Sequence, residues 1–206
     1  MKWKGITGYP SGWDDFQRHV MYTGADHFGF KVEVGDVNRF AARFRAAKCF
    51  KGVRLDGYSS NTEAGYAALC RVLFVYSAFE TYLDITGNTA ASISADLSAA
   101  GADSLMKRIK SLDTHDRFYK FIYERVNSSH KRELDNYFND DPCNVAFLAS
   151  AIRHIFAHGS LSPSAGGSES SEAVKICDAV SIFLLSFMEK DFAKRIAAGC
   201  EEIYGT

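Results

Sequence analysis

Apolar side chains recur at helical spacing along most of the chain, and the clearest example lies between Cys143 and Pro163. At about 100° per residue, one face of a helix there is apolar. It carries Val145, Leu148, Ile152, Ile155 and Phe156. Gly159 is a helix stop signal, strengthened by the serine and proline that follow it. The pattern predicts a helix over residues 143–159.

The opposite face of this predicted helix is polar, and its side chains have the chemistry needed to handle phosphate. It carries Ser150, Arg153, His154 and His158. Arginine stays charged and binds two phosphate oxygens at once, while histidine transfers protons near neutral pH. The helix leads into residues 160–171, which are rich in serine and glycine and predict a mobile loop. We interpret this face as a phosphate site, with an RNA backbone as the expected ligand.

Helical periodicity also covers most of the rest of the chain. The segments that it predicts as helices are 36–50, 61–87, 103–112, 114–126, 128–138 and 172–198. Asp36 is the expected cap of the first segment, and Asn61 or Thr62 that of the second. Residues 88–101 are rich in alanine and serine and predict a short helix or a loop. The predicted fold class is all-α, a bundle of about six or seven helices.

Residues 1–35 have a different pattern, with six glycines among seven aromatic side chains. So many aromatic residues argue against disorder and predict an arm that packs on the body of the protein. Phe30, Val32 and Val34 alternate with charged residues, which predicts one short strand. We therefore expect two parts. Residues 1–60 form an irregular N-terminal extension with the first helix, and residues 61–206 form the helical domain.

Glu80 lies in the middle of the main apolar stripe of the segment 61–87. A buried carboxylate needs a partner, because an unpaired buried charge costs several kcal/mol. Two interpretations stay open. Glu80 is either a core residue bonded to a tyrosine or a backbone donor, or it orients a cation of the Arg153 face.

Basic residues concentrate between Lys107 and Arg132. Eight lysines and arginines there face only three acidic residues, with four aromatic rings between them. Such a stretch is either a solvated helix face or a groove that follows a phosphate backbone and stacks bases. The candidate RNA-binding residues are Lys107, Arg108, Lys110, Arg117 and Lys120.

Composition narrows the function classes further. The chain has 206 residues and a formal net charge of −1, so it has no overall positive field and any basic site must be local. Its five cysteines show neither paired metal spacing nor a disulfide framework, which favours reduced thiols in a cytoplasm. The N-terminus lacks the apolar region of a signal peptide, and the longest apolar run is too short to cross a bilayer. We expect a cytoplasmic protein with no membrane partner and no cofactor.

Other chemistries of the polar face have less support. His154 and His158 stand four residues apart, as two metal ligands on one helix do, but no acid and no third ligand has the matching spacing. No serine has the sequence context of a nucleophile elbow. A purely structural interpretation also stays open, with a histidine favoured at the helix C-terminus and a surface arginine.

The same residues resemble the signature of the HEPN superfamily, the higher eukaryotes and prokaryotes nucleotide-binding domains. That signature is an arginine, four to six residues and a histidine at the end of an apolar helix, as in Arg153 to His158. A polar residue commonly follows the arginine, and here it is His154. The stretch SAFETYL is similar to the family's early helix, where Glu80 occupies the place of a frequent acidic residue. The resemblance covers roughly residues 61–200 and implies the HEPN helical fold.

The resemblance also implies an activity. HEPN ribonucleases cut RNA without metal, using arginine and histidine from two protomers of a dimer. The RNA 2′-hydroxyl is the nucleophile, so the protein has to move protons and stabilise charge on phosphorus. Arg153 and His158 are then the expected catalytic residues, with His154, Glu80 and Ser150 in support. Phe147, an apolar ring on the polar face, suggests that a second protomer covers it in a homodimer.

Three hypotheses remain open. The first is a metal-independent endoribonuclease that cleaves single-stranded RNA, as a toxin with an antitoxin-like protein partner or as a defence component. The second is a non-catalytic HEPN module that binds a nucleotide or a partner protein. The third is a helical assembly protein without a ligand, in which Arg153 and His158 are buried and paired inside the monomer.

Overall fold

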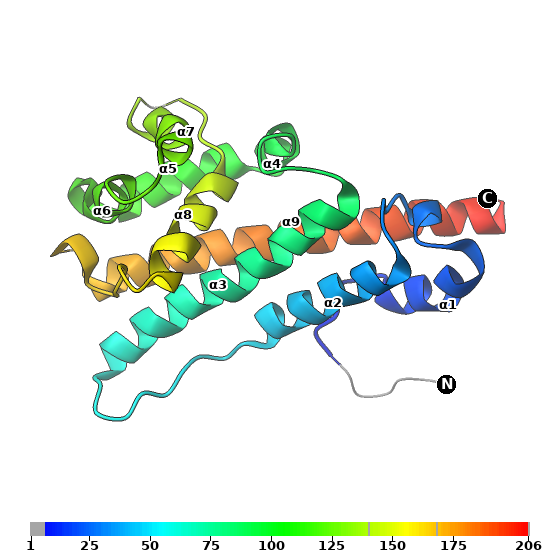
Figure 1. Cartoon of the computed structure of the whole chain (residues 1–206), viewed down its shortest axis with the longest axis horizontal. Helices are drawn as coiled ribbons and strands as arrows, with labels where there is room; N and C mark the ends of the chain where they lie inside the picture. Colours follow the sequence, from blue (N-terminus) through cyan, green and yellow to red (C-terminus); the bar gives the residue numbers. More distant parts are fainter. Residues whose placement is uncertain (1–6, 140, 168, 206) are drawn as a thin grey trace.

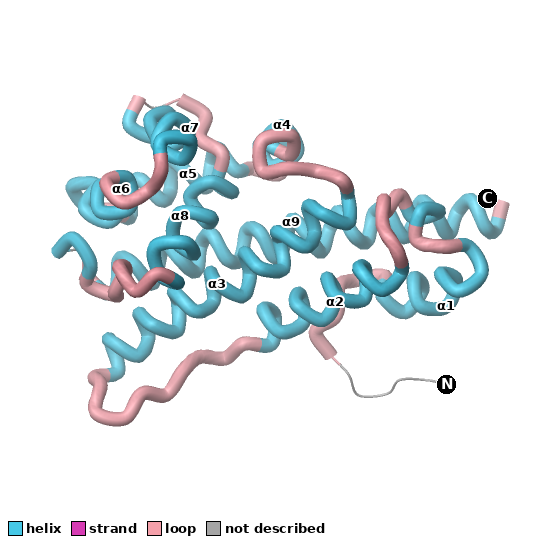
Figure 2. The backbone as a smooth tube through the Cα atoms, viewed as in Figure 1, coloured by secondary structure: helices cyan, strands magenta, loops and turns pink. Residues whose placement is uncertain are grey.

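The computed structural model describes residues 7–139, 141–167 and 169–205, and all the regular structure in these residues is helical. Helix, with the 3₁₀ turns included, accounts for 74% of these described residues, and Figure 2 shows helices joined by loops, with no strand in the described part. The nine α-helices there are Trp13–Thr23 (α1), Val34–Cys49 (α2), Ser60–Thr86 (α3), Ser94–Ala99 (α4), Ala102–Leu112 (α5), Arg117–Tyr123 (α6), Ser128–Phe138 (α7), Val145–Ala157 (α8) and Ser170–Tyr204 (α9). The all-α prediction is confirmed, but the predicted number of six or seven helices is too low.

The two longest helices, α3 and α9, lie side by side along the long axis of the molecule (Figure 1). Arg71 of α3 pairs with Asp178 of α9. Further along both helices, Tyr82 of α3 donates a hydrogen bond to Asp191 of α9. Residue numbers rise together on both helices, so α3 and α9 run parallel. Their facing sides contribute much of one continuous hydrophobic core.

The N-terminal segment packs against one end of this pair as an aromatic cluster. Phe16, Phe28, Phe30, Phe40 and Phe192 are all buried, and the Phe16 and Phe192 rings lie 6.0 Å apart. The expected packing of this segment on the body is present in residues 7–35; residues 1–6 lie outside the described part. The segment is more regular than expected, because it contains α1, which Gly24 terminates.

The predicted strand over 30–34 is wrong. No neighbouring strand exists in the described residues to pair with it, and the alternation arises because Phe30 enters the aromatic cluster while Lys31 donates its N–H to the carbonyl of Ile85. Helix α2 already begins at Val34. A two-residue periodicity over so short a segment does not specify a ladder.

Two other predicted boundaries also need correction. Ser59, and not Asn61 or Thr62, caps α3, since its hydroxyl accepts the N–H of Thr62. The predicted helix over 114–126 is broken, because His115 and Asp116, which belong to the 3₁₀ turn over Thr114–Asp116 just before α6, have left-handed backbone angles. The short helix expected within 88–101 is α4. The predicted stop of α3 at Gly87 is present, in the left-handed conformation.

Helices α4 to α8 form a second group on the other side of α3 and α9 (Figure 1). The predicted helix over 143–159 is α8, capped by the side chain of Asn144, and its apolar face is buried against the body. Helix α8 packs on the middle of α3, which brings its polar face near Glu80. Among the described residues, no helix is both long enough and apolar enough to cross a membrane.

Candidate functional site

An ion pair between α8 and α3 is the centre of the candidate site. The Nη2 atom of Arg153 donates a hydrogen bond to Glu80 Oε2 at 3.3 Å. The Arg153 side chain is 37% exposed and the Glu80 side chain 42% exposed. Glu80 is therefore not the buried carboxylate that its sequence position predicted. It holds one edge of a guanidinium group whose other donors can meet a ligand.

The two histidines expected beside Arg153 lie at the exposed end of α8. The rings of His154 and His158 are 4.4 Å apart at an interplanar angle of 62°. His158 is the C-terminal cap of the helix, and its N–H donates to the carbonyl of His154. Both side chains are open to solvent. They are accessible to a ligand that approaches this end of the helix.

Ser150 lies one turn before these residues and joins the site to α3. Its side chain shares a hydrogen bond with Tyr76, a buried residue one turn before Glu80. Burial raises the pKa of Tyr76, and the hydrogen bond with Ser150 partly offsets this effect. The charges of Glu80 and Arg153 also act on the phenol. Tyr76, Glu80, Ser150 and Arg153 thus form one polar cluster between the two helices.

A third imidazole reaches the same cluster from α7. The Nε2 atom of His130 lies 3.1 Å from Ser150 Oγ, and its Nδ1 atom lies 3.0 Å from Oδ1 of Asn127. Asn127 caps α7, and the same Oδ1 accepts the backbone N–H of His130 at 3.0 Å. Burial lowers the pKa of His130, and the neighbouring His154 lowers it further. Asn127 and His130 belong to the site, although the sequence analysis did not identify them.

His130 also changes the interpretation of Phe147. The two rings meet edge to face with centroids 5.6 Å apart, and Phe147 is half-buried. The ring was expected to be open beside the histidines and so to indicate a second protomer. The premise of an open ring is therefore wrong, because His130 of the same chain packs against Phe147.

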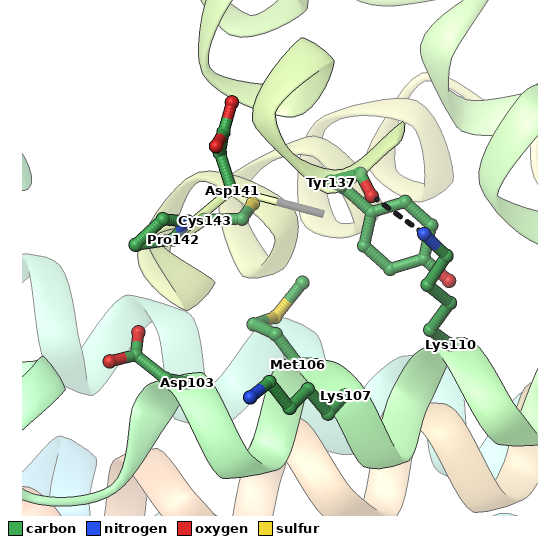
Figure 3. Close-up of a pocket in the computed structure, with 8 residues that line it drawn as sticks. All are labelled: Asp103, Met106, Lys107, Lys110, Tyr137, Asp141, Pro142 and Cys143. Carbon is green, nitrogen blue, oxygen red and sulfur yellow. Dashed lines mark hydrogen bonds between the residues drawn. The ribbon is translucent and has the colours of Figure 1, made fainter. Parts of the chain in front are cut away.

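The candidate RNA-binding residues do not gather in one groove. Lys107 and Lys110 line a cavity of about 220 Å³ between α5 and the segment that joins α7 to α8 (Figure 3). Lys110 Nζ donates to the carbonyl of Tyr137 at 3.2 Å, as the dashed line in Figure 3 marks. Arg108 instead lines a separate hollow between α5 and α9. The three residues of α5 therefore face two different parts of the surface.

The two candidates on α6 hold local structure. Arg117 donates to the carbonyl of Gly167 at 3.2 Å, which ties α6 to the loop after α8. Lys120 Nζ lies 4.0 Å from Asp116 and donates to the carbonyl of His115 at 3.3 Å. No ion pair or hydrogen bond among the described residues links these basic side chains to Arg153.

Sequence reasoning missed Asn127 and His130. His130 and Ser150 are twenty positions apart on different helices, so no spacing rule connects them. Asn127 does have a recognisable signal, because asparagine is a preferred N-cap residue; its side chain accepts the backbone N–H of His130, three residues later. Within the described part, no group of three or more histidine, cysteine, aspartate or glutamate side chains is placed to hold a metal ion.

Comparison of this chain with protein-family models, with curated proteins and with solved structures finds no match. The chemistry of the site is therefore the basis for a functional assignment. A half-exposed guanidinium, three imidazoles, a hydroxyl and a buried phenol lie on or against the polar face of α8 between Ser150 and His158. This set can bind an anionic group, neutralise charge that develops on it and transfer protons near neutral pH.

Proposed function

We propose that this protein is a metal-independent endoribonuclease of HEPN type that cleaves single-stranded RNA at the α8 site. The observation that carries the proposal is how Arg153 is paired and exposed. A single carboxylate orients its guanidinium group, which is only half-buried, within the last two turns of a helix that ends in two exposed histidines. That is the arrangement needed to hold a phosphodiester beside a proton-transfer group.

The proposed reaction assigns one role to each group. The RNA 2′-hydroxyl attacks the adjacent phosphorus, the P–O5′ bond breaks, and the products are a 2′,3′-cyclic phosphate and a 5′-hydroxyl. Arg153 neutralises the additional negative charge on the phosphoryl oxygens. His158 transfers a proton. Glu80 orients Arg153, and His154 is the neighbour that supports His158.

A homodimer remains part of this proposal, because the HEPN resemblance implies two Arg153–His158 pairs in one site. Light scattering at micromolar concentration tests it, and a monomer that cleaves RNA would remove the dimer while leaving the chemistry. A toxin role with an antitoxin-like protein partner is likewise carried by the resemblance alone. Its test is growth arrest on expression of the wild-type chain but not of Arg153→Ala.

A second candidate function is a non-catalytic HEPN-like module that binds a nucleotide or a partner protein. Two observations favour it: Lys110, Arg117 and Lys120 are engaged with the protein's own backbone, and Arg153 already has an ionic partner. Fluorescence anisotropy separates the two candidates. Binding of labelled RNA without any cleavage would select the module.

The direct experiment is incubation of the purified protein with single-stranded RNA in EDTA, beside DNA of the same sequence. We expect the RNA to be cut and the DNA to survive, because DNA lacks the 2′-hydroxyl. Cleavage that requires added divalent metal, or that persists unchanged in an Arg153→Ala/His158→Ala double variant, would contradict the mechanism. Loss of RNA binding in the same double variant, with no cleavage by the wild type, would select the binding module.

A further inference from the structure

Proton transfer at this site needs two groups, one that accepts the 2′-hydroxyl proton and one that protonates the leaving oxygen. The Arg153–His158 signature provides one imidazole in each chain. The α7–α8 contact brings a different imidazole into the same polar cluster, and its two hydrogen bonds fix which of its nitrogens carries the hydrogen and which carries the lone pair.

The tautomer of His130 follows from its partners. Oδ1 of Asn127 is an acceptor, so His130 Nδ1, 3.0 Å away, has to donate its hydrogen to it. In the neutral ring the lone pair is then on Nε2, the atom that lies 3.1 Å from Ser150 Oγ. The same Asn127 oxygen caps α7, which holds the ring in place through the backbone as well as the side chain. His130 therefore presents a fixed, basic nitrogen to a hydroxyl group.

We propose that His130 is the general base of the α8 site, held by Asn127 with its Nε2 lone pair directed at the hydroxyl of Ser150, through which it acts on the substrate. The proposal rests on the proposed ribonuclease function and adds a residue to it. Ser150 Oγ fills the space next to Nε2, so it is the relay between this nitrogen and the ribose 2′-hydroxyl. The 2′-hydroxyl proton passes to Ser150 Oγ and the Ser150 proton passes to His130 Nε2 as the P–O2′ bond forms, and the His154–His158 pair returns a proton to the 5′-oxygen as the P–O5′ bond breaks.

The geometry of α8 suits this division of roles. Ser150 precedes His154 by one helical turn, a rise of about 6 Å, so the base and the acid lie on either side of the phosphate position. Arg153 lies between them in sequence, with its half-exposed guanidinium available to the phosphoryl oxygens. The charged and titratable groups that face His130 are His154 on α8 and, through Ser150, Tyr76 with its neighbours Glu80 and Arg153. Both proton-transfer groups then come from one chain.

The test compares two histidine variants in the RNA cleavage assay in EDTA. His130→Gln keeps a hydrogen-bonding group for Ser150 but cannot accept a proton at neutral pH, and we expect kcat/KM to fall about 10²-fold or more. His115→Asn is the matched control: His115 is exposed and has a left-handed backbone that asparagine tolerates, and its one described contact, with Lys120, uses the backbone carbonyl that the variant keeps, so the variant is expected to match the wild type.

A pH profile adds a readout that a structural role would not change. In the wild type, kcat/KM is expected to rise with pH as the base loses its proton, and His130→Gln should lack this acidic limb. Asn127→Asp keeps the helix cap and places a negatively charged carboxylate beside Nδ1, which raises the pKa of His130 and should move the limb to higher pH. This second variant carries the test if His130→Gln does not fold.

The possible outcomes distinguish failure of the ribonuclease function from failure of the role of His130. Cleavage by the wild type together with a His130→Gln rate within threefold of it, or with an unmoved limb in Asn127→Asp, would overturn the role of His130 alone. A wild type that cleaves no RNA would overturn the ribonuclease function, and the role of His130 with it. A large loss in His130→Gln, an unchanged His115→Asn and a shifted limb in Asn127→Asp would establish His130 as the base.

Discussion

Helix α3 carries two clusters of the same composition, each with a tyrosine, an acid and an arginine, and they differ in how completely their groups are paired. In the first cluster, Tyr82 is fully buried and donates to Asp191. Arg195 donates to the same carboxylate at 2.7 Å and to the carbonyl of Gly29 at 3.2 Å. Both charged side chains are less than one-third exposed. This cluster ties α9 to α3 and to the N-terminal segment, and its arginine has several partners within the protein.

The second cluster, formed by Tyr76, Glu80 and Arg153, lies six residues or less from the first along α3 but faces α8. Arg153 makes one contact of 3.3 Å with Glu80 and is more exposed than Arg195. The same three side-chain types thus stabilise the fold at one place and leave donors available at the other. The number of protein partners of the arginine distinguishes the two: Arg195 has several and belongs to a structural cluster, whereas Arg153 has one and belongs to a candidate site.

The largest expected difference lies between the two arginines. Arg153→Ala should lower the RNA cleavage rate about 10²- to 10³-fold, the effect of removing an electrostatic group, with little change in stability. Arg195→Ala should instead reduce the free energy of unfolding by about 2 kcal/mol, because it leaves Asp191 without its cation. Cleavage rates and urea denaturation of both variants measure the contrast. Equal losses of stability in the two would contradict it.

Replacing the acid of the open cluster should have a smaller effect. Glu80→Gln keeps the size of the side chain and its hydrogen-bonding capacity but removes the charge that orients Arg153. We expect about a tenfold loss in cleavage, equivalent to about 1.4 kcal/mol in the barrier, with an unchanged melting temperature. If the melting temperature falls and activity falls only in proportion, Glu80 is a structural residue.

Removal of one hydroxyl tests the closed cluster alone. Tyr82→Phe should cost about 1 kcal/mol of unfolding free energy, the typical value for one intramolecular hydrogen bond, and leave cleavage unchanged. Chemical denaturation beside the RNA assay measures both quantities. A loss of activity without a loss of stability would show that the two clusters are coupled.

The smallest expected effect is a pH dependence of stability from His130. Burial lowers its pKa in the folded protein below 6.5, the ordinary value. Below pH 6.5 the unfolded chain therefore binds more protons than the folded chain, so the free energy of unfolding decreases as the pH falls toward the folded-state pKa. His130→Gln should lose this part of the dependence between pH 8 and pH 5. Urea denaturation curves that remain parallel for wild type and variant across this range would contradict the burial of a neutral ring.

The sequence predicts those parts of the fold that follow from local periodicity. The apolar stripes of α3, α8 and α9 and the stop at Gly87 have direct physical signals, and all are present. The break at His115 and Asp116 has none, because neither left-handed residue is a glycine. There the buried carboxylate of Asp113 accepts the N–H groups of Phe118 and Tyr119, five and six residues later, and so starts α6.

The candidate site likewise has residues that could be predicted from the sequence and one that could not. Ser150, Arg153, His154 and His158 were predictable because they share one helix, and their common face follows from its geometry. The pairing of Arg153 with Glu80 was one of two open interpretations, and the structure has that contact. His130 could not be found, because its position depends on how α7 packs on α8.

The most direct test of the central claim is the chemical identity of the RNA ends produced in EDTA. Mass spectrometry of the products should find a 2′,3′-cyclic phosphate on one fragment and a 5′-hydroxyl on the other, and a 2′-O-methyl group at the mapped cleavage position should abolish the cut. Products with a 5′-phosphate, or a cut that persists next to the 2′-O-methyl group, would contradict attack by the 2′-hydroxyl at the Arg153–His158 site.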